Sequence, residues 1–271
     1  GRELRSFGAN ISLTTKSGSM PVEMGGVPVG RLEQQTYLPE ADLPRLKSIF
    51  WKNNITAFAP FLYGEADAGG RQVLVAGTWF EHDVAQDDGG SFHTGLKEVS
   101  PMWQVEGEWP SGAGQALVGR ELAAQMGLKP GDRLTLSRGG FRTESTVAGI
   151  VSGGGPEDGQ VFLDLSEAQA LLGLPGQVEK VQVSALTKPP DELARRAQAL
   201  DSPRDLPPEE YEKWYCSPYI DAITWQIEEV FPGGTAKPDR RVAEAEGAFL
   251  GKMKLLFILI AGTALAASAL G

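Results

Sequence analysis

Residues 115–137 read QALVGRELAAQMGLKPGDRLTLS and contain the signals of a strand, a helix, a turn and a second strand. The apolar run ending at Val118 predicts the first strand, and the residues up to Met126 predict a short helix. Gly127 can take the left-handed conformation that ends a helix, and the Pro-Gly-Asp sequence at 130–132 predicts a turn. Short strands joined by tight turns are typical of a β-rich module.

This character extends from Trp79 to about Gly176. Gly139-Gly140 predicts a hairpin, and QVFLDL predicts a strand followed by a helix. Ser166 and Gln169 have the spacing of a capping box at the start of that helix. We therefore expect a β-rich subdomain over 79–176.

The residues before this subdomain predict strand, helix, strand and strand. NISLTT at 10–15 alternates apolar and polar residues, which predicts a strand. Asp42 is a candidate N-cap of a helix. The apolar positions on one face of that helix are Leu43, Leu46 and Phe50. Two apolar runs separated by Gly69-Gly70 then predict a hairpin.

Strand and helix character returns after the subdomain. VEKVQVSAL at 178–186 predicts a strand, and Asp191 begins a helix. A proline-rich connector leads to a second helical stretch with a bend near Pro218. The halves 1–78 and 177–238 therefore match in style. We predict one α+β domain interrupted by an insertion, rather than two domains in series.

The C-terminal residues predict a stalk helix that enters a membrane over 239–271. No charged residue occurs from Leu255 to Gly271, a length of about 25 Å as a helix, against a hydrocarbon core of roughly 30 Å. The alternative is a buried core helix. A heptad-spaced seam indicates packing against a partner helix. The seam positions expected to couple two stalks are Val242, Phe249, Met253 and Leu256.

Composition sets limits on function. Hydrophobic residues make up 41% and charged residues 22%, as in folded proteins, and the formal net charge of −10 argues against a nucleic-acid partner. The single cysteine permits no internal disulfide. Because the chain starts at Gly1 without Met or a signal-like apolar run, we expect a segment of a longer protein.

Motifs for catalysis are missing from the sequence. The glycine-rich stretch 152–160 has no Gly-Lys-Ser/Thr, and no Gly-x-Ser-x-Gly elbow occurs. His82 and His93 lie among carboxylates and could in principle hold a divalent metal. Their spacing fits no helical pair or short metal hairpin, so we interpret the segment as a solvated loop and predict no metal site.

Cys216 lies within an aromatic segment, EKWYCSPYIDAITW. It has no second cysteine or adjacent histidine, so we interpret it as a small residue packed in an aromatic cluster rather than a thiolate ligand or redox site. The segment is also a candidate surface for a hydrophobic cargo or partner. The residues of that surface are Trp214, Tyr215, Cys216 and Tyr219.

Three stretches together resemble one family. ALVGRELAAQMGLKPGDRLTLS followed by VAGIV is similar to the centre of the extracytoplasmic domain of MacB-type, FtsX-like ABC transporter permeases. GANISLTTKSG resembles the strand after their first membrane helix, and RRVAEAEGAFLGKMKLLFILIAGTALAASALG resembles their stalk entering the second.

The resemblance implies a porter-like α+β domain with a β-rich insertion, no enzyme activity and no cofactor in this segment. It implies that a separate cytoplasmic ABC ATPase subunit hydrolyses ATP. This permease and a second permease protomer, as a homodimer or heterodimer, would together transmit that movement through the stalk and the inner membrane to the periplasm by mechanotransmission. The result would be transport of a cargo or switching of a periplasmic partner protein.

Two other interpretations stay open. The chain could be a membrane-tethered binding or adhesion module without an ATPase, which the absence of a neighbouring ATPase gene would support. It could also be a metal-handling protein that uses Cys216 or the His82 and His93 segment, which calorimetry with Fe, Cu or Zn tests.

Overall fold

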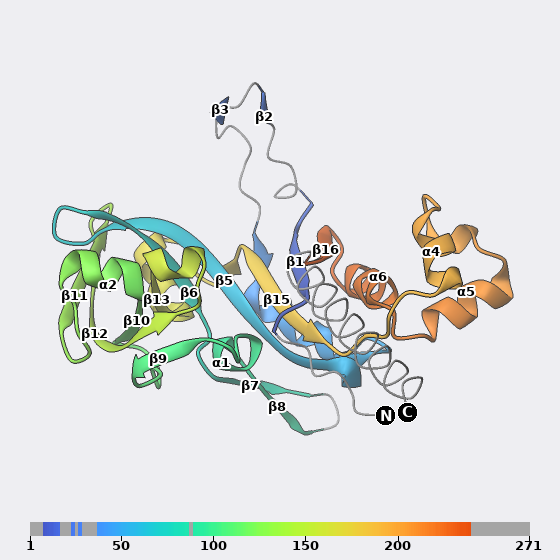
Figure 1. Ribbon diagram of the computed structural model, residues 1–271, viewed down its shortest axis with the longest axis horizontal. Helices are drawn as coiled ribbons and strands as arrows, with labels where there is room; N and C mark the ends of the chain where they lie inside the picture. Colours follow the sequence, from blue (N-terminus) through green and yellow to red (C-terminus); the bar gives the residue numbers. More distant parts are fainter. Residues whose placement is uncertain (1–7, 17–22, 25–26, 29–36, 87–88, 240–271) are drawn as a thin grey trace, which may run out of the picture.

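The computed structural model describes residues 8–16, 23–24, 27–28, 37–86 and 89–239. Runs of strands are separated by short helices, and a group of consecutive helices precedes the last strand (Figure 1). The strands are β1 (Ile11–Thr15), β2 (Glu23–Met24), β3 (Val27–Pro28), β4 (Leu38–Pro39), β5 (Ile55–Asp67), β6 (Gln72–Thr78), β7 (His82–Ala85), β8 (Ser91–Thr94), β9 (Gln104–Gly107), β10 (Gln115–Gly119), β11 (Arg133–Arg138), β12 (Phe141–Ser152), β13 (Gln160–Asp164), β14 (Gln177–Val178), β15 (Lys180–Ala185) and β16 (Gly234–Pro238). The α-helices are α1 (Leu96–Val99), α2 (Arg120–Met126), α3 (Leu165–Leu172), α4 (Glu192–Gln198), α5 (Pro208–Tyr215) and α6 (Ile220–Val230). The 3₁₀ helices are η2 (Glu40–Lys47), η3 (Lys52–Asn54), η4 (Pro156–Gly159) and η5 (Pro203–Asp205).

Ten strands form one sheet, which confirms the expected α+β fold. Their order is β11-β12-β10-β13-β6-β5-β15-β1-β16, with β9 added to β12. β11 also pairs with β5 through Ser137 and Asp67. The six strands from β11 to β5 therefore close into a small barrel, seen at the left of Figure 1. The strands β15, β1 and β16 extend the sheet beyond the barrel.

Strand β5 belongs to both parts of this sheet. Residues 55–61 pair with β15, and residues 61–67 pair with β6. A strand of 13 residues extends over roughly 40 Å. Within the barrel, β13 pairs in parallel with β6. Backbone hydrogen bonds therefore join a strand before the predicted insertion, which begins at residue 79, to a strand inside it. The domain limits 1–78, 79–176 and 177–238 stay predictions.

Alternating residues of the barrel strands face two different cores. On β10, Ala116 and Val118 pack in the cluster that includes α2 and α3, whereas Leu117 faces the cluster beneath α1. Helix α3 approaches β6 closely, because a Cβ at Gly77 would lie 2.2 Å from the Cβ of Ala168. A separate core joins the central strands to η2 and α6.

Several local predictions are confirmed. Gly127 has a φ of 68° and ends α2, and Gly139-Gly140 turns β11 into β12. Asp191 caps α4 by accepting a hydrogen bond from the backbone N–H of Ala194 at 3.2 Å. The hairpin at Gly69-Gly70 joins β5 to β6.

The helix predicted to begin at Asp42 is different in the structure. It is the 3₁₀ helix η2, which begins at Glu40 and contains Pro44. A 3₁₀ helix has three residues per turn, so the buried positions recur every three residues and continue to Ile49. Phe50, which the α-helical period places in the core, is 59% exposed.

The predicted capping box of α3 is wrong. Asp164 is the N-cap and accepts hydrogen bonds from both the N–H and the hydroxyl of Ser166. The side chain of Gln169 points away from the helix start and donates to Glu40 Oε2 at 2.8 Å. A tertiary acceptor therefore replaces the local contact expected for this amide.

Candidate functional site

The described chain enters and leaves the sheet at one place. β1 and β16 are antiparallel neighbours, and Ile11 lies opposite Pro238. The N–H of Asp239 donates to the carbonyl of Asn10 at 2.8 Å. The side chain of Asn10 is buried and exchanges two hydrogen bonds with the backbone of Ala185 on β15, at 2.8 and 2.9 Å. Both ends of the described domain are therefore hydrogen-bonded to each other and to the sheet.

The four predicted coupling residues, Val242, Phe249, Met253 and Leu256, lie outside the described residues. Apart from Asp239, so does the predicted stalk and membrane segment 239–271. Among the residues that are described, no helix combines the length and apolar character that crossing a bilayer requires.

The predicted aromatic surface is mostly interior. Trp214 and Tyr219 are each only 1% exposed and pack with α4 and α6, at the right of Figure 1. Tyr215 is partly buried, and Cys216 is exposed. The interpretation of Cys216 as a packed residue is therefore wrong, because it follows the last turn of α5 on the solvent side. Trp214 and Tyr219 are therefore core residues and do not contribute to an exposed surface.

Sequence reasoning missed the aromatic group that is exposed nearby. Phe50 lies 5.2 Å from the ring of Trp51 and 6.1 Å from the ring of Tyr215, measured between ring centroids. The indole N–H of Trp51 donates to the carbonyl of Tyr215 at 3.0 Å, which ties η3 to α5. The signal in the sequence was the pair of adjacent large aromatic residues Phe50-Trp51, which an α-helix separates by about 100° around its axis, so that both cannot face the core equally.

Tyr219 also holds α4 through its hydroxyl. The hydroxyl donates to Asp191 at 2.5 Å, and the ammonium of Lys188 lies 3.3 Å from the same carboxylate. Lys188 is 4.1 Å from the Tyr219 ring centre. The Tyr219 hydrogen bond, followed by the Ala194 N–H and Lys188, lowers the pKa of Asp191 to about 2. The carboxylate is therefore charged at physiological pH and holds the cap in place.

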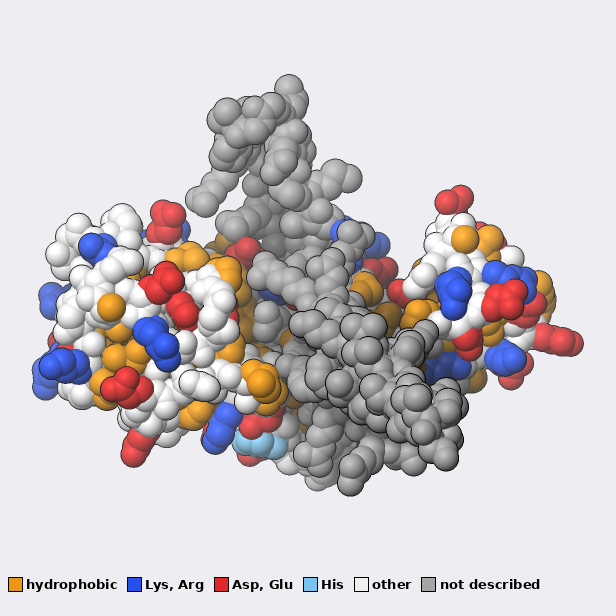
Figure 2. Space-filling view, viewed as in Figure 1, with side chains coloured by type: hydrophobic (Ala, Val, Ile, Leu, Met, Phe, Trp, Pro, Cys, Tyr) orange, Lys and Arg blue, Asp and Glu red, His pale blue; other side chains and the backbone are white. Residues whose placement is uncertain are grey.

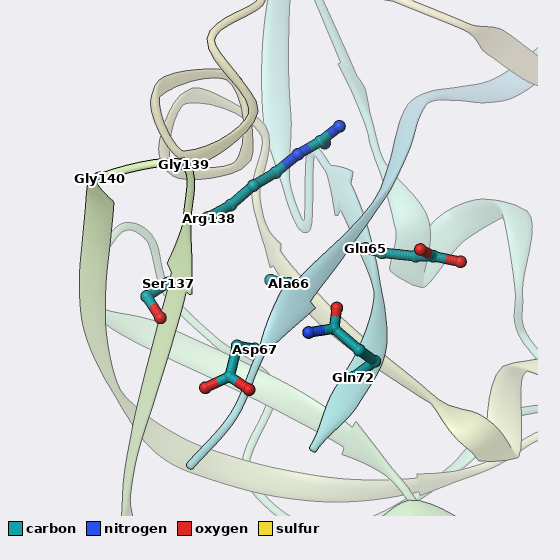
Figure 3. A pocket seen from close by; sticks show the side chains of 8 residues that line it. All are labelled: Glu65, Ala66, Asp67, Gln72, Ser137, Arg138, Gly139 and Gly140. Atoms are coloured by element: carbon teal, nitrogen blue, oxygen red, sulfur yellow. The ribbon is translucent and has the colours of Figure 1, made fainter. Parts of the chain in front are cut away.

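A shallow groove lies where the barrel closes, between the β5–β6 and β11–β12 hairpins. It is lined by Glu65, Ala66, Asp67, Gln72, Ser137, Arg138, Gly139 and Gly140. In Figure 3, the side chains of Glu65, Asp67 and Arg138 point in different directions. The groove therefore does not converge its charged groups on one ligand position.

The histidine-containing segment is a hairpin rather than a solvated loop. β7 pairs with β8, and His82 stacks on Trp79 with ring centroids 4.0 Å apart. His93 Nδ1 lies 3.0 Å from Asp83 Oδ1. The Asp83 hydrogen bond, with the negative charge of Glu98 adding to it, raises the pKa of His93. The hairpin and the following helix α1 bring Glu81, His93 and Glu98 close to one another, although their spacing in the sequence matches no familiar metal motif. The expectation of no metal site stays a prediction.

The proteins similar to this chain include one family and two solved structures. A family model described as the MacB-like periplasmic core domain matches residues 4–202. The periplasmic region of MacB from Actinobacillus actinomycetemcomitans matches at 12% identity with a TM-score of 0.48, over 89% of this chain and 94% of that one. The extracellular domain of the noncanonic ABC-type transporter YknZ from Gram-positive bacteria matches at 15% identity with a TM-score of 0.41, over 70% of this chain and 87% of that one. No curated protein matches the chain.

Proposed function

Because the chain belongs to the family of MacB-like periplasmic core domains, we propose that it receives ATP-driven movement from an ABC transporter permease and passes it to a cargo or partner outside the membrane. The family assignment confirms the resemblance noted in the sequence. In this proposal a separate cytoplasmic subunit hydrolyses ATP, and a second permease protomer completes the transporter in the bacterial inner membrane.

The observation that carries the proposal is the pairing of Ile11 with Pro238. A domain attached to a bilayer through both ends receives movement most directly when the two attachments are adjacent. The hydrogen bonds of Asn10 to Ala185 then connect this place to β15. Since β15 pairs with β5, and β5 continues into the barrel, displacement at β1 and β16 has a continuous hydrogen-bonded route into the rest of the sheet.

The proposal requires an ATPase partner, which can be isolated. The intact permease, purified in mild detergent from cells that express the neighbouring genes, should retain an ATPase subunit with a phosphate-binding loop. A complex without ATPase activity would instead support the membrane-tethered binding module.

Coupling can be measured without knowing the cargo. Lys237 is an exposed residue of β16, so Lys237→Cys provides a thiol to which an environment-sensitive fluorophore can be attached. Cys216→Ser removes the exposed native cysteine, so that only position 237 is labelled. We expect the fluorophore's emission to change when ATP is added to the complex. Replacing Phe249 and Met253 with Asp should abolish that change while ATP hydrolysis continues, because the stalk seam is disrupted.

The matched control places the same apolar-to-Asp changes away from the stalk. Met102 and Phe141 are 69% and 56% exposed, so Met102→Asp and Phe141→Asp should leave the fluorescence response intact. An unchanged response in the Phe249 and Met253 variant would remove the stalk seam from the mechanism.

A further inference from the structure

The β7–β8 hairpin and α1 bring three metal-binding side chains together. Glu81 precedes β7, His93 lies on β8, and Glu98 lies on α1. One donor atom from each of these residues lies within 4.8 Å of the other two. Figure 2 shows histidine atoms beside acidic side chains at the lower edge of the molecule. This group, Glu81, His93 and Glu98, is called the hairpin triad.

The histidine of the triad is already oriented. Its Nδ1 is engaged by Asp83 at 3.0 Å, which leaves Nε2 facing Glu98 Oε1 at 3.6 Å. A carboxylate that holds the second nitrogen of a histidine is the arrangement that positions imidazole ligands in metal sites. Asp83 therefore fixes the ring so that Nε2 is presented to the carboxylates.

A second observation concerns the other oxygen of Glu98. Its Oε2 is buried and receives no hydrogen bond from the described residues. A carboxylate oxygen removed from water without a donor is unfavourable unless a cation or an ordered water satisfies it. This need is independent of the proximity of the three side chains, and a cation bound by Glu98 would satisfy it.

We propose that the hairpin triad binds one Zn²⁺ ion through His93 Nε2 and one oxygen each of Glu81 and Glu98, with water completing the coordination. Zinc accepts imidazole and carboxylate ligands and tolerates an open fourth position, whereas Mg²⁺ and Ca²⁺ favour sites of oxygen atoms alone. This proposal goes beyond the transport role and does not depend on it.

Lys97 competes with the metal. Its ammonium lies 2.7 Å from Glu81 Oε1, so it supplies the positive charge that the metal would supply. Both side chains are about half exposed, and the Lys97 stem can swing into solvent when an ion binds. Removing this ammonium should therefore strengthen zinc binding. Any acidic patch would also gain affinity for cations in this way, so the evidence for a specific site comes from the histidine variants rather than from Lys97.

The test is isothermal titration calorimetry with ZnCl₂ on the full chain, purified without a histidine tag in detergent at pH 8. The wild type should bind one ion. His93→Gln should weaken binding at least about tenfold, and Asp83→Asn about tenfold through loss of ring orientation. Lys97→Met should tighten binding several-fold.

His82→Gln is the matched control, because His82 lies on the same hairpin but stacks on Trp79 outside the triad. It should bind zinc as the wild type does, and all variants should keep the wild-type circular dichroism spectrum. The proposal is overturned if the wild type takes up no zinc, if His93→Gln binds as tightly as the wild type, or if His82→Gln loses binding to the same extent.

Discussion

The amino group of Lys47 is held inside the protein. The residue is 9% exposed, and its Nζ donates to the carbonyls of Lys52 at 2.7 Å and Ile55 at 3.1 Å. The nitrogen also lies 3.8 Å from the ring centre of Phe92. Burial, followed by the positive charge of Lys52, lowers the pKa of Lys47 to about 8. This side chain joins η2, η3 and the β7–β8 hairpin.

The lowered pKa predicts a rise in stability with pH. The unfolded lysine titrates at 10.5, so between about pH 8 and 10.5 the unfolded state binds the extra proton and stability increases as pH rises. From pH 7.5 to 9.5, the wild type should gain about 2 kcal/mol more than Lys47→Met, or roughly 5 °C in thermal midpoint. An equal pH response in the two proteins would show that Lys47 titrates normally.

Trp214 and Cys216 are close in sequence, but substitution should destabilise the protein strongly at Trp214 and very little at Cys216. Trp214→Ala empties a buried site in the α4–α6 core and should cost about 3 to 5 kcal/mol. Cys216→Ser alters an exposed side chain and should stay within about 0.5 kcal/mol of the wild type. Thermal denaturation distinguishes them. Comparable losses would restore the packed interpretation of Cys216.

The elements around the barrel are joined by one carboxylate. Glu40, the first residue of η2, accepts from the indole N–H of Trp79 at 3.1 Å and from the amide of Gln169 at 2.8 Å. Trp79 follows β6, and Gln169 lies on α3. Both donors are only 6% exposed. Glu40 therefore connects the first half of the porter-like part to both ends of the predicted insertion.

Removing this carboxylate should loosen that junction. Glu40→Ala leaves the buried indole N–H of Trp79 without an acceptor and leaves the amide of Gln169 with only the carbonyl of Gln177, at 3.2 Å. The change should cost about 2 kcal/mol, lowering the thermal midpoint by roughly 5 °C. Asp42→Ala is the control on the same helix, because Asp42 forms only a partly exposed ion pair with Arg45. It should change stability by less than about 0.5 kcal/mol. Equal effects of the two variants would contradict a special role for Glu40.

Elements whose signals are local could be predicted from the sequence. The helix end at Gly127, the cap at Asp191 and the Gly69-Gly70 hairpin depend on residues within one turn of each other. The 3₁₀ period of η2 was missed because Pro44 and the packing of Ile49 outweigh the α-helical pattern.

Features that depend on distant residues could not be predicted in this way. Barrel closure joins Asp67 to Ser137, and the hairpin triad joins three separate elements. The sequence identified the aromatic segment around Trp214 but not its burial, because burial is decided by how α4, α5 and α6 pack. The candidate surface is therefore displaced to Phe50 and its neighbours.

Across the whole molecule, a single ten-stranded sheet connects the β1–β16 pair with the barrel. The route begins at the β1–β16 pair, passes through β15, and reaches the barrel along β5 (Figure 1). Adjacent strands along this route are joined by backbone hydrogen bonds as well as by side-chain contacts. Under the proposed function, we therefore expect these strands to respond together when the ATPase subunit binds ATP.

Amide hydrogen exchange of the intact permease with its ATPase tests this expectation most directly. With a non-hydrolysable ATP analogue, exchange in β1, β16, β15 and the first half of β5 should change together, relative to the nucleotide-free complex. Exchange that is identical in these strands with and without the analogue, while the ATPase subunit itself responds, would contradict the claim that the domain receives its movement through this edge of the sheet.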